Sequence, residues 1–182
     1  MNIGLVTSFI TGGILMISIL ALHLNLFQNA NQTTMDMLSM DNLKAVVEVV
    51  DHDFTKIGYG VSADVFTTAD SNQVTYQSDI DDDGTVNSVS WRFNPGQPNT
   101  QTPNPNDFTL QRIVDGNTLN LGLNVTDFEL TYFTMNGTAT TNPDSIRQVR
   151  VNIICQAPAA YRNRFAESAW EKTYIPINLF LK

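Results

Sequence analysis

Three patterns of hydrophobic and polar residues follow one another along the chain. In the first, from Ile3 to Phe27 (IGLVTSFITGGILMISILALHLNLF), apolar residues would surround a helix on all sides, and the first charged residue is Asp36. A segment of this length can cross a hydrocarbon core about 30 Å thick. The basic start and small-residue cleavage site of a secretory signal peptide are both missing from this stretch. We therefore expect a membrane-embedded helix; the alternative is a buried core helix.

The second pattern is an apolar stripe that repeats every three to five residues, which is typical of an amphipathic helix. Charged residues such as Lys44 and Glu48 occupy the opposite face, and Gly58 and Gly60 predict where the helix ends. Joined to the apolar segment, the stripe predicts one helix from Ile3 to Ile57, about 80 Å long. The stripe residues expected to pack against the rest of the chain are Leu43, Val46, Val50, Phe54 and Ile57.

The third pattern alternates apolar and polar residues with a period of two, as half-buried strands do. Turn signals at Asp115-Gly116 and Asn136-Gly137 separate short strands with no helix between them, which predicts an antiparallel sheet. Residues 94–107 (NPGQPNTQTPNPND) are polar and Pro-rich and predict an exposed loop without strand character. The predicted strands lie at 74–77, 89–93, 108–111, 119–123, 128–132, 149–153 and 174–181.

These patterns predict an α+β fold, in which a long N-terminal helix packs on one antiparallel β-sheet domain. Its parts would be a hydrophobic transmembrane or filament-core half-helix (1–28), an amphipathic half-helix (29–60) and a sheet domain (61–182).

Composition narrows the range of functions. Among 182 residues only 15% are charged, and the formal net charge is −8, which argues against a basic groove for nucleic acid. The single cysteine, Cys155, excludes an internal disulfide and a multi-thiolate metal site. Two histidines leave little material for acid–base catalysis. We therefore expect no enzyme.

One acidic segment has the pattern of a metal-binding loop. Carboxylates at alternate positions followed by glycine match the first part of a calcium loop, in which a backbone carbonyl supplies a further ligand. Position twelve of that pattern would be a bidentate acid, but here it is Ser90. The alternative is therefore a solvated acidic turn. The candidate calcium ligands are Asp79, Asp81, Asp83, the carbonyl of Thr85, and Asn87.

Small residues recur every four positions in the apolar segment, at Gly4, Ser8 and Gly12. They lie on one helical face, where small side chains let helices approach closely in lipid. The alternative is that glycine is simply common in membrane helices. Two other segments have less specific patterns. Asp51-His52-Asp53 predicts a solvated helix face, and the aromatic residues within 158–172 predict either an exposed recognition loop or domain packing.

The order of these features resembles that of type IV pilins and type II secretion pseudopilins, closest to the W-type minor pilins and J-type pseudopilins. The similar segments are Asp53–Val61 (DFTKIGYGV) at the helix end, Asp79–Gly84 (DIDDDG), Val125–Phe133 (VTDFELTYF), Ile146–Val151 (IRQVRV) and Tyr174–Leu179 (YIPINL).

The resemblance implies a filament subunit that resides in the inner membrane of a bacterial envelope before assembly. It would then join other pilin or pseudopilin subunits in an extracellular or periplasmic filament used in adhesion or secretion. Pilins are made with a short basic leader, so either this is the processed sequence or this branch has lost the leader. The family's usual glutamate at the fifth position is Leu5 here. That difference implies a tip subunit, or a membrane-anchored domain that does not polymerise in the usual way and binds calcium or another ligand.

Overall fold

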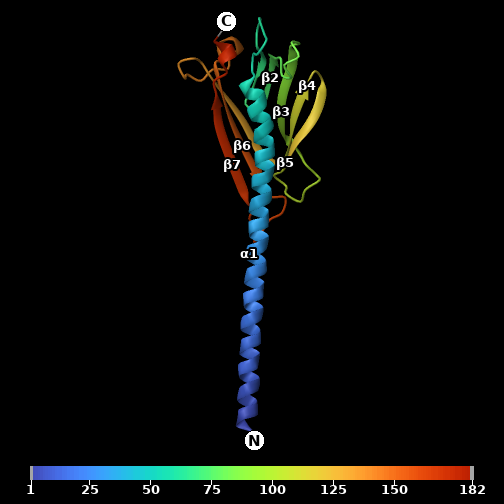
Figure 1. Cartoon of the computed structure of the whole chain (residues 1–182), viewed down its shortest axis with the longest axis vertical. Coiled ribbons are helices and arrows are strands. Elements are labelled where there is room, and N and C mark those ends of the chain that lie inside the picture. The colour runs from blue at the N-terminus through green and yellow to red at the C-terminus, as the bar shows by residue number, and fades with distance from the viewer. Residues whose placement is uncertain (1, 181–182) are drawn as a thin grey trace.

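The computed structural model describes residues 2–180, except for the side chains at positions 122 and 123. One helix, α1 (Ile3–Thr55), is 53 residues long and carries a β-sheet domain beside its C-terminal half. Figure 1 shows the N-terminal half extending alone, away from the domain. The predicted α+β fold is confirmed.

The domain is one antiparallel sheet whose seven strands are ordered in space as they are in sequence, from β1 to β7. Each strand therefore pairs with the next one along the chain. A sheet of this kind buries one face and leaves the other to solvent. Its strands are β1 (Phe66–Ala69), β2 (Gln73–Ser78), β3 (Asn87–Pro98), β4 (Phe108–Val114), β5 (Asn117–Phe133), β6 (Gln148–Gln156) and β7 (Glu167–Tyr174).

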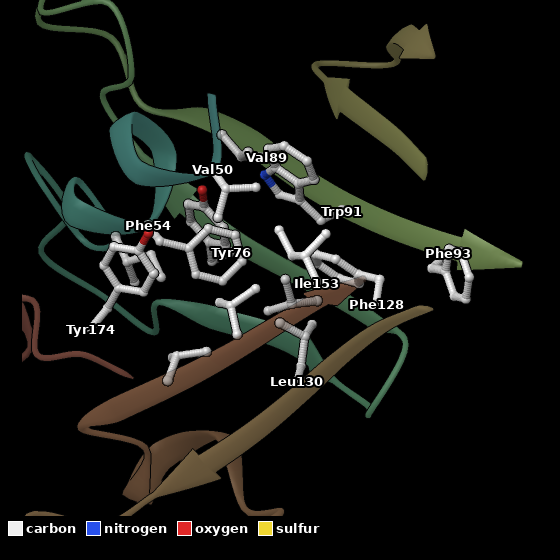
Figure 2. Packing of buried hydrophobic residues seen from close by; sticks show 14 of the residues in the cluster. Val50, Phe54, Tyr76, Val89, Trp91, Phe93, Phe128, Leu130, Ile153 and Tyr174 are labelled. Carbon is white, nitrogen blue, oxygen red and sulfur yellow. The ribbon is translucent and has the colours of Figure 1, made fainter. Parts of the chain in front are cut away.

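The buried face of the sheet packs against the C-terminal half of α1, as the apolar stripe predicts. Phe54 is fully buried, and Figure 2 shows its ring among the side chains of Tyr76, Trp91 and Tyr174. The centroid of the Phe54 ring lies 6.2, 6.1 and 5.5 Å from the centroids of these three rings, respectively. Trp91 in turn stacks on Phe128 across the sheet, with ring centroids 6.2 Å apart. All five predicted stripe residues are buried: Leu43, Val46, Val50, Phe54 and Ile57.

Strand β5 joins two strands that the sequence predicts as separate. Its first part, 117–125, pairs with β4, and its second part, from Val125 to Phe133, pairs with β6. Near the junction of the two parts, Asn124 has a φ of +83°, and the register with β6 shifts between Val125 and Asp127. Asparagine tolerates this left-handed conformation better than most residues, so the strand changes partner without an intervening loop.

Two predicted strands have the wrong bounds, and one strand was not predicted. Strand β3 continues to Pro98, so residues 94–98 of the expected Pro-rich loop are strand; the loop proper is 99–107. The last strand ends at Tyr174, whereas the sequence predicts a last strand over 174–181. After Tyr174 the chain turns at Pro176 into a short 3₁₀ helix, η2 (Ile177–Leu179). Position 181 lies outside the described residues. Strand β1 has no counterpart among the predicted strands.

Two turns lie close to their predicted positions. Gly58 has a φ of +76° just after α1, which ends at Thr55, two residues before the expected Ile57. Gly137 has a φ of +78° in the turn after β5, but a second 3₁₀ helix, η1 (Pro143–Ser145), follows this turn before β6 begins. The connection between β5 and β6 is therefore longer than a two-residue hairpin.

Candidate functional site

The acidic loop, residues 79–87, connects β2 to β3 beside the C-terminal end of α1. Asp79 is the anchored member, with 5% of its surface exposed. Its two carboxylate oxygens accept hydrogen bonds from the backbone N–H groups of Asp83 (3.1 Å) and Gly84 (3.0 Å). Its own N–H donates to the carbonyl of Tyr59, at 2.8 Å. The loop is therefore folded around one buried carboxylate and fastened to the end of the helix.

Three of the four acids in this loop converge. Oxygen atoms of Asp79, Asp81 and Asp83 lie within 4.8 Å of one another, and the last two side chains are exposed. Asp82 instead pairs with Lys56, whose Nζ lies 2.6 Å from its Oδ2. Alternate residues thus point to one place, as the spacing predicts, and these three carboxylates could hold a metal ion.

Two further predicted ligands have structural roles in the same loop. The N–H of Thr85 donates to Asp83 Oδ1 at 2.7 Å. Asn87 accepts from the N–H of Ile80 through Oδ1, at 3.2 Å, and donates through Nδ2 to Asp115 at 2.8 Å. Hydrogen bonds from the Ser88 N–H and from Asn87 lower the pKa of Asp115. Asn87 therefore holds the loop against the turn between β4 and β5. Its side-chain hydrogen bonds go to Ile80 and Asp115, and not to Asp79, Asp81 or Asp83.

A buried charged cluster, which the sequence analysis missed, fixes the end of α1 to the sheet. Asp53 is fully buried and accepts two hydrogen bonds from Arg112, at 2.6 Å from Nε and 2.9 Å from Nη2. It also accepts from Trp91 Nε1 at 3.0 Å. The hydrogen bond to Asp53 raises the pKa of Arg112, which stays charged. The predicted solvated face at Asp51-His52-Asp53 is thus wrong for Asp53.

The position of Asp53 explains how it could have been found. It follows Val50 by three residues and precedes Ile57 by four, so helical spacing alone places it on the buried face. A carboxylate there needs a partner, because an unpaired buried charge is very costly. Arg112 on β4 supplies that partner from 59 residues away, a distance over which periodicity carries no information.

The loop proper of the Pro-rich segment is also fastened by a buried acid. Asp107 accepts from Thr102 Oγ1 at 2.6 Å and from the N–H of Asn124 at 2.5 Å. Burial raises the pKa of Asp107, although both hydrogen bonds oppose that rise. The bond to Asn124 lies at the point where β5 changes its pairing partner, so the loop and the irregular backbone hold each other in place.

The N-terminal half of α1 is the other candidate site. Every described residue from 2 to 27 is exposed, and this is the only helix in the described part of the chain long and apolar enough to cross a membrane. Its hydroxyl groups donate to carbonyls of the preceding turn: Ser8 to Gly4 at 2.9 Å, and Ser18 to Ile14 at 2.9 Å. Such internal bonds satisfy polar side chains without water. This half-helix could anchor the chain in a membrane.

The predicted small-residue face is open within a single chain. A Cβ placed on Gly12 would meet no atom within 4 Å, and one placed on Gly4 would meet only Asn2 Oδ1, at 4.0 Å. Gly12 and its neighbour Gly13 both lie within continuous helix. The face formed by Gly4, Ser8 and Gly12 is therefore not used in packing within this chain.

No family model matches the chain, and no curated protein is similar enough to count as a match. The resemblance to pilins and pseudopilins therefore stays a prediction from the sequence.

Proposed function

We propose that this chain is a structural subunit of a filament of the type IV pilus or secretion pseudopilus kind, assembled through the exposed half of α1. The supporting observation is the contrast within one helix. One face of residues 28–55 packs on the domain, whereas residues 2–27 are uncharged, mostly apolar and all exposed. Apolar surface of this extent needs an environment that removes it from water, either lipid or other helices.

The proposal also names where the subunit resides before assembly and which subunits it then joins. The subunit would wait in the inner membrane of a bacterial cell with its apolar half-helix in lipid, and would then join other pilin or pseudopilin subunits outside that membrane. It would act by assembly and not by catalysis. The apolar half-helix contains no carboxylate that could pair with a neighbouring subunit, so we propose a minor or tip subunit.

The test compares two substitutions in adjacent glycines. Gly12→Ile puts a branched side chain on the small-residue face, whereas Gly13→Ile puts the same side chain about 100° around the helix; neither glycine has an atom near its Cβ position. The full chain should join filaments when expressed with its partner subunits. Gly12→Ile should reduce its incorporation about tenfold, as measured by immunolabelling in electron micrographs, because helices can no longer approach closely.

Gly13→Ile is the matched control, since it carries the same loss of glycine and the same gain of a β-branched residue. Incorporation that is reduced equally by both substitutions would show that the face is not what matters. Absence of the wild-type chain from every filament would favour the alternative proposal, a membrane-anchored envelope domain that does not polymerise.

That alternative draws on the acidic loop, and here we propose that calcium is the ion the three carboxylates hold. The observation in favour is the convergence of Asp79, Asp81 and Asp83 within 4.8 Å. Sites of this type in extracellular modules have Kd values of about 10⁻⁴–10⁻³ M. Calcium at a few millimolar should then raise the free energy of unfolding by about 1 kcal/mol, measured by thermal melting in calcium and in chelator.

The loop also supplies a matched control for this test. Asp81→Asn removes one converging carboxylate and should reduce the calcium response. Asp82→Asn removes the same charge from the neighbouring residue, whose carboxylate pairs with Lys56, and should leave the response intact. Identical melting of the wild type in calcium and in chelator would show that the loop is a solvated acidic turn.

A further inference from the structure

The connection between β6 and β7 lies beside α1 where the two halves of the helix meet (Figure 1). We call residues 157–166 the 157–166 loop. It is closed by backbone hydrogen bonds from Ala157 to Ala166 (2.8 Å) and from Tyr161 to Arg164 (2.7 Å). Nη2 of Arg162 donates to Oε1 of Gln28 at 2.6 Å. The tip of the loop is thus held at a known position along the helix.

That position coincides with the end of the apolar segment. Gln28 is the first partly buried residue of α1, and all described residues before it are exposed. The segment Ile3–Phe27 has a length of about 37 Å at 1.5 Å per residue, which exceeds the roughly 30 Å hydrocarbon core. In a chain anchored by this segment, Gln28 and the guanidinium bound to it would therefore lie among the lipid headgroups.

The side chains of the loop suit that layer. Arg162 and Arg164 are exposed, and Tyr161 and Phe165 are half-buried beside them. The guanidinium of Arg162 also lies over the Tyr161 ring, 5.4 Å from its centroid. Aromatic side chains are enriched at membrane–water interfaces, where a ring meets both lipid and water. Together with α1 these four residues line a groove of about 400 Å³.

The charge of the loop contrasts with that of the chain, whose formal net charge is −8. The guanidinium of Arg164 makes no hydrogen bond or ion pair with any residue the structure describes. Asp36 also lines the groove, but it lies eight residues beyond Gln28, about 12 Å farther from the apolar segment. Glu167 accepts a hydrogen bond from Gln156 at 3.0 Å. The loop, at the end of the domain nearer the apolar segment, therefore carries two exposed cations, of which Arg162 is the one held against Gln28.

We propose that the 157–166 loop docks on anionic lipid headgroups, with Arg162 and Arg164 binding phosphate oxygens while Tyr161 and Phe165 lie at the interface. Guanidinium groups bind phosphate through paired N–H donors. A neighbouring copy of this chain offers no such acceptor at this level, because its first 35 residues contain no acidic side chain. The proposal rests on the membrane-anchored stage of the proposed function.

The test uses the full chain, one copy per lipid nanodisc, with an environment-sensitive fluorophore on Ala160→Cys. Ala160 is exposed and adjoins Tyr161. The native Cys155 is fully buried and its pKa is raised by burial to about 12, so it should stay unlabelled. Acrylamide, a neutral quencher, should reach the label less readily in discs that contain phosphatidylglycerol than in discs of phosphatidylcholine alone.

Charge variants give the expected size of the effect. Each arginine near an anionic surface changes the ratio of docked to undocked loop about fivefold, so Arg162→Gln with Arg164→Gln should lower that ratio about 30-fold. Arg92→Gln with Arg150→Gln removes the same charge from two exposed strand positions, Arg92 on β3 and Arg150 on β6, and should leave the protection unchanged.

The outcomes separate this inference from the proposal on which it rests. Protection that is equal in both lipids and survives the loop variant would overturn lipid docking and favour coverage by protein. Protection lost equally in both double variants would show a general charge effect and would also overturn it. A chain that fails to remain with the discs in either lipid would contradict membrane anchoring itself.

Discussion

The two halves of α1 share one continuous backbone but face different surroundings. In the N-terminal half, Phe9 is 83% exposed, whereas Phe54 in the C-terminal half is fully buried among aromatic rings. The first half has no sheet beside it, and the second provides one layer of the domain core. Burial of a phenylalanine contributes about 1.5–3 kcal/mol to folding, so only the second half stabilises the domain.

The difference teaches where to look for stability and where to look for function. A side chain in the packed half can be judged by its contacts within this chain. A side chain in the exposed half is not buried by the domain, so its role must depend on lipid or on another subunit. The acidic loop and the 157–166 loop lie beside opposite ends of the packed half, the first near Tyr59 and the second near Gln28.

The largest expected effect tests directly whether only the packed half of α1 stabilises the domain. Phe54→Ala should lower the free energy of unfolding of the domain by about 3–5 kcal/mol, because it leaves a cavity among Tyr76, Trp91 and Tyr174. Phe9→Ala, the matched change in the exposed half, should alter it by less than about 0.5 kcal/mol. Both can be measured by denaturant unfolding of the full chain in detergent, followed through tryptophan fluorescence. A loss below about 1 kcal/mol for Phe54→Ala would reject this packing.

The next effect concerns the charged cluster at the end of the packed half. Asp53→Ala should cost about 3 kcal/mol, because Arg112 would keep its charge without a partner and Trp91 Nε1 would lose its acceptor. Asp36→Ala removes an exposed carboxylate from the same helix and should be nearly neutral. Equal costs for the two variants would show that Asp53 does not pair with Arg112 in solution.

A smaller effect should follow from releasing the 99–107 loop. Asp107→Ala should cost about 1–3 kcal/mol, since it leaves the buried N–H of Asn124 without its acceptor. Hydrogen exchange should then speed up at Asn124 and in the loop, with little change in β6 and β7. A matched Asp144→Ala change, at an exposed acid in η1, serves as the control. Uniformly faster exchange across the sheet would instead indicate global destabilisation.

The smallest effect is a dependence of the free energy of unfolding on pH, caused by Asp51 near the C-terminal end of α1. A hydrogen bond from Lys172 lowers the pKa of Asp51 below its ordinary value of 3.8. The stabilisation is therefore present above that value and is lost as the pH falls through the lowered pKa. Because both groups are about half exposed, Asp51→Asn should cost only about 0.5 kcal/mol at neutral pH. The difference from wild type should vanish in acid; a difference that is constant with pH would contradict the ion pair.

Local pattern was enough to predict several elements because each is set by neighbours a few residues apart. The apolar stripe placed Leu43, Val46, Val50, Phe54 and Ile57 on one face, and all five are buried. Alternating residues in β3 placed Val89, Trp91 and Phe93 inward, and they too are buried. The converging carboxylates followed from the spacing Asp79, Asp81 and Asp83. Periods of 3.6 and two are properties of the backbone, so they can be read without knowing the fold.

Other features depend on residues that are distant in the sequence. The partner of Asp53 lies on β4, and nothing near Asp53 in the sequence indicates it. The turn of β5 at Asn124 is held by Asp107, which lies 17 residues earlier. The position of the 157–166 loop along α1 is fixed by a hydrogen bond between Arg162 and Gln28, which are 134 residues apart. Such contacts arise only when segments that are distant in the sequence pack together.

The sequence by itself therefore determined that one long helix, apolar and then amphipathic, leads into an antiparallel sheet, and that one turn concentrates acidic groups. Only the tertiary structure decided which acid is buried and paired, where β5 changes partner, and which loop meets the helix at the end of its apolar half. The physical reason is that periodicity and turn chemistry act over a few residues, whereas the pairing of buried charges and the docking of loops are settled by packing between distant segments.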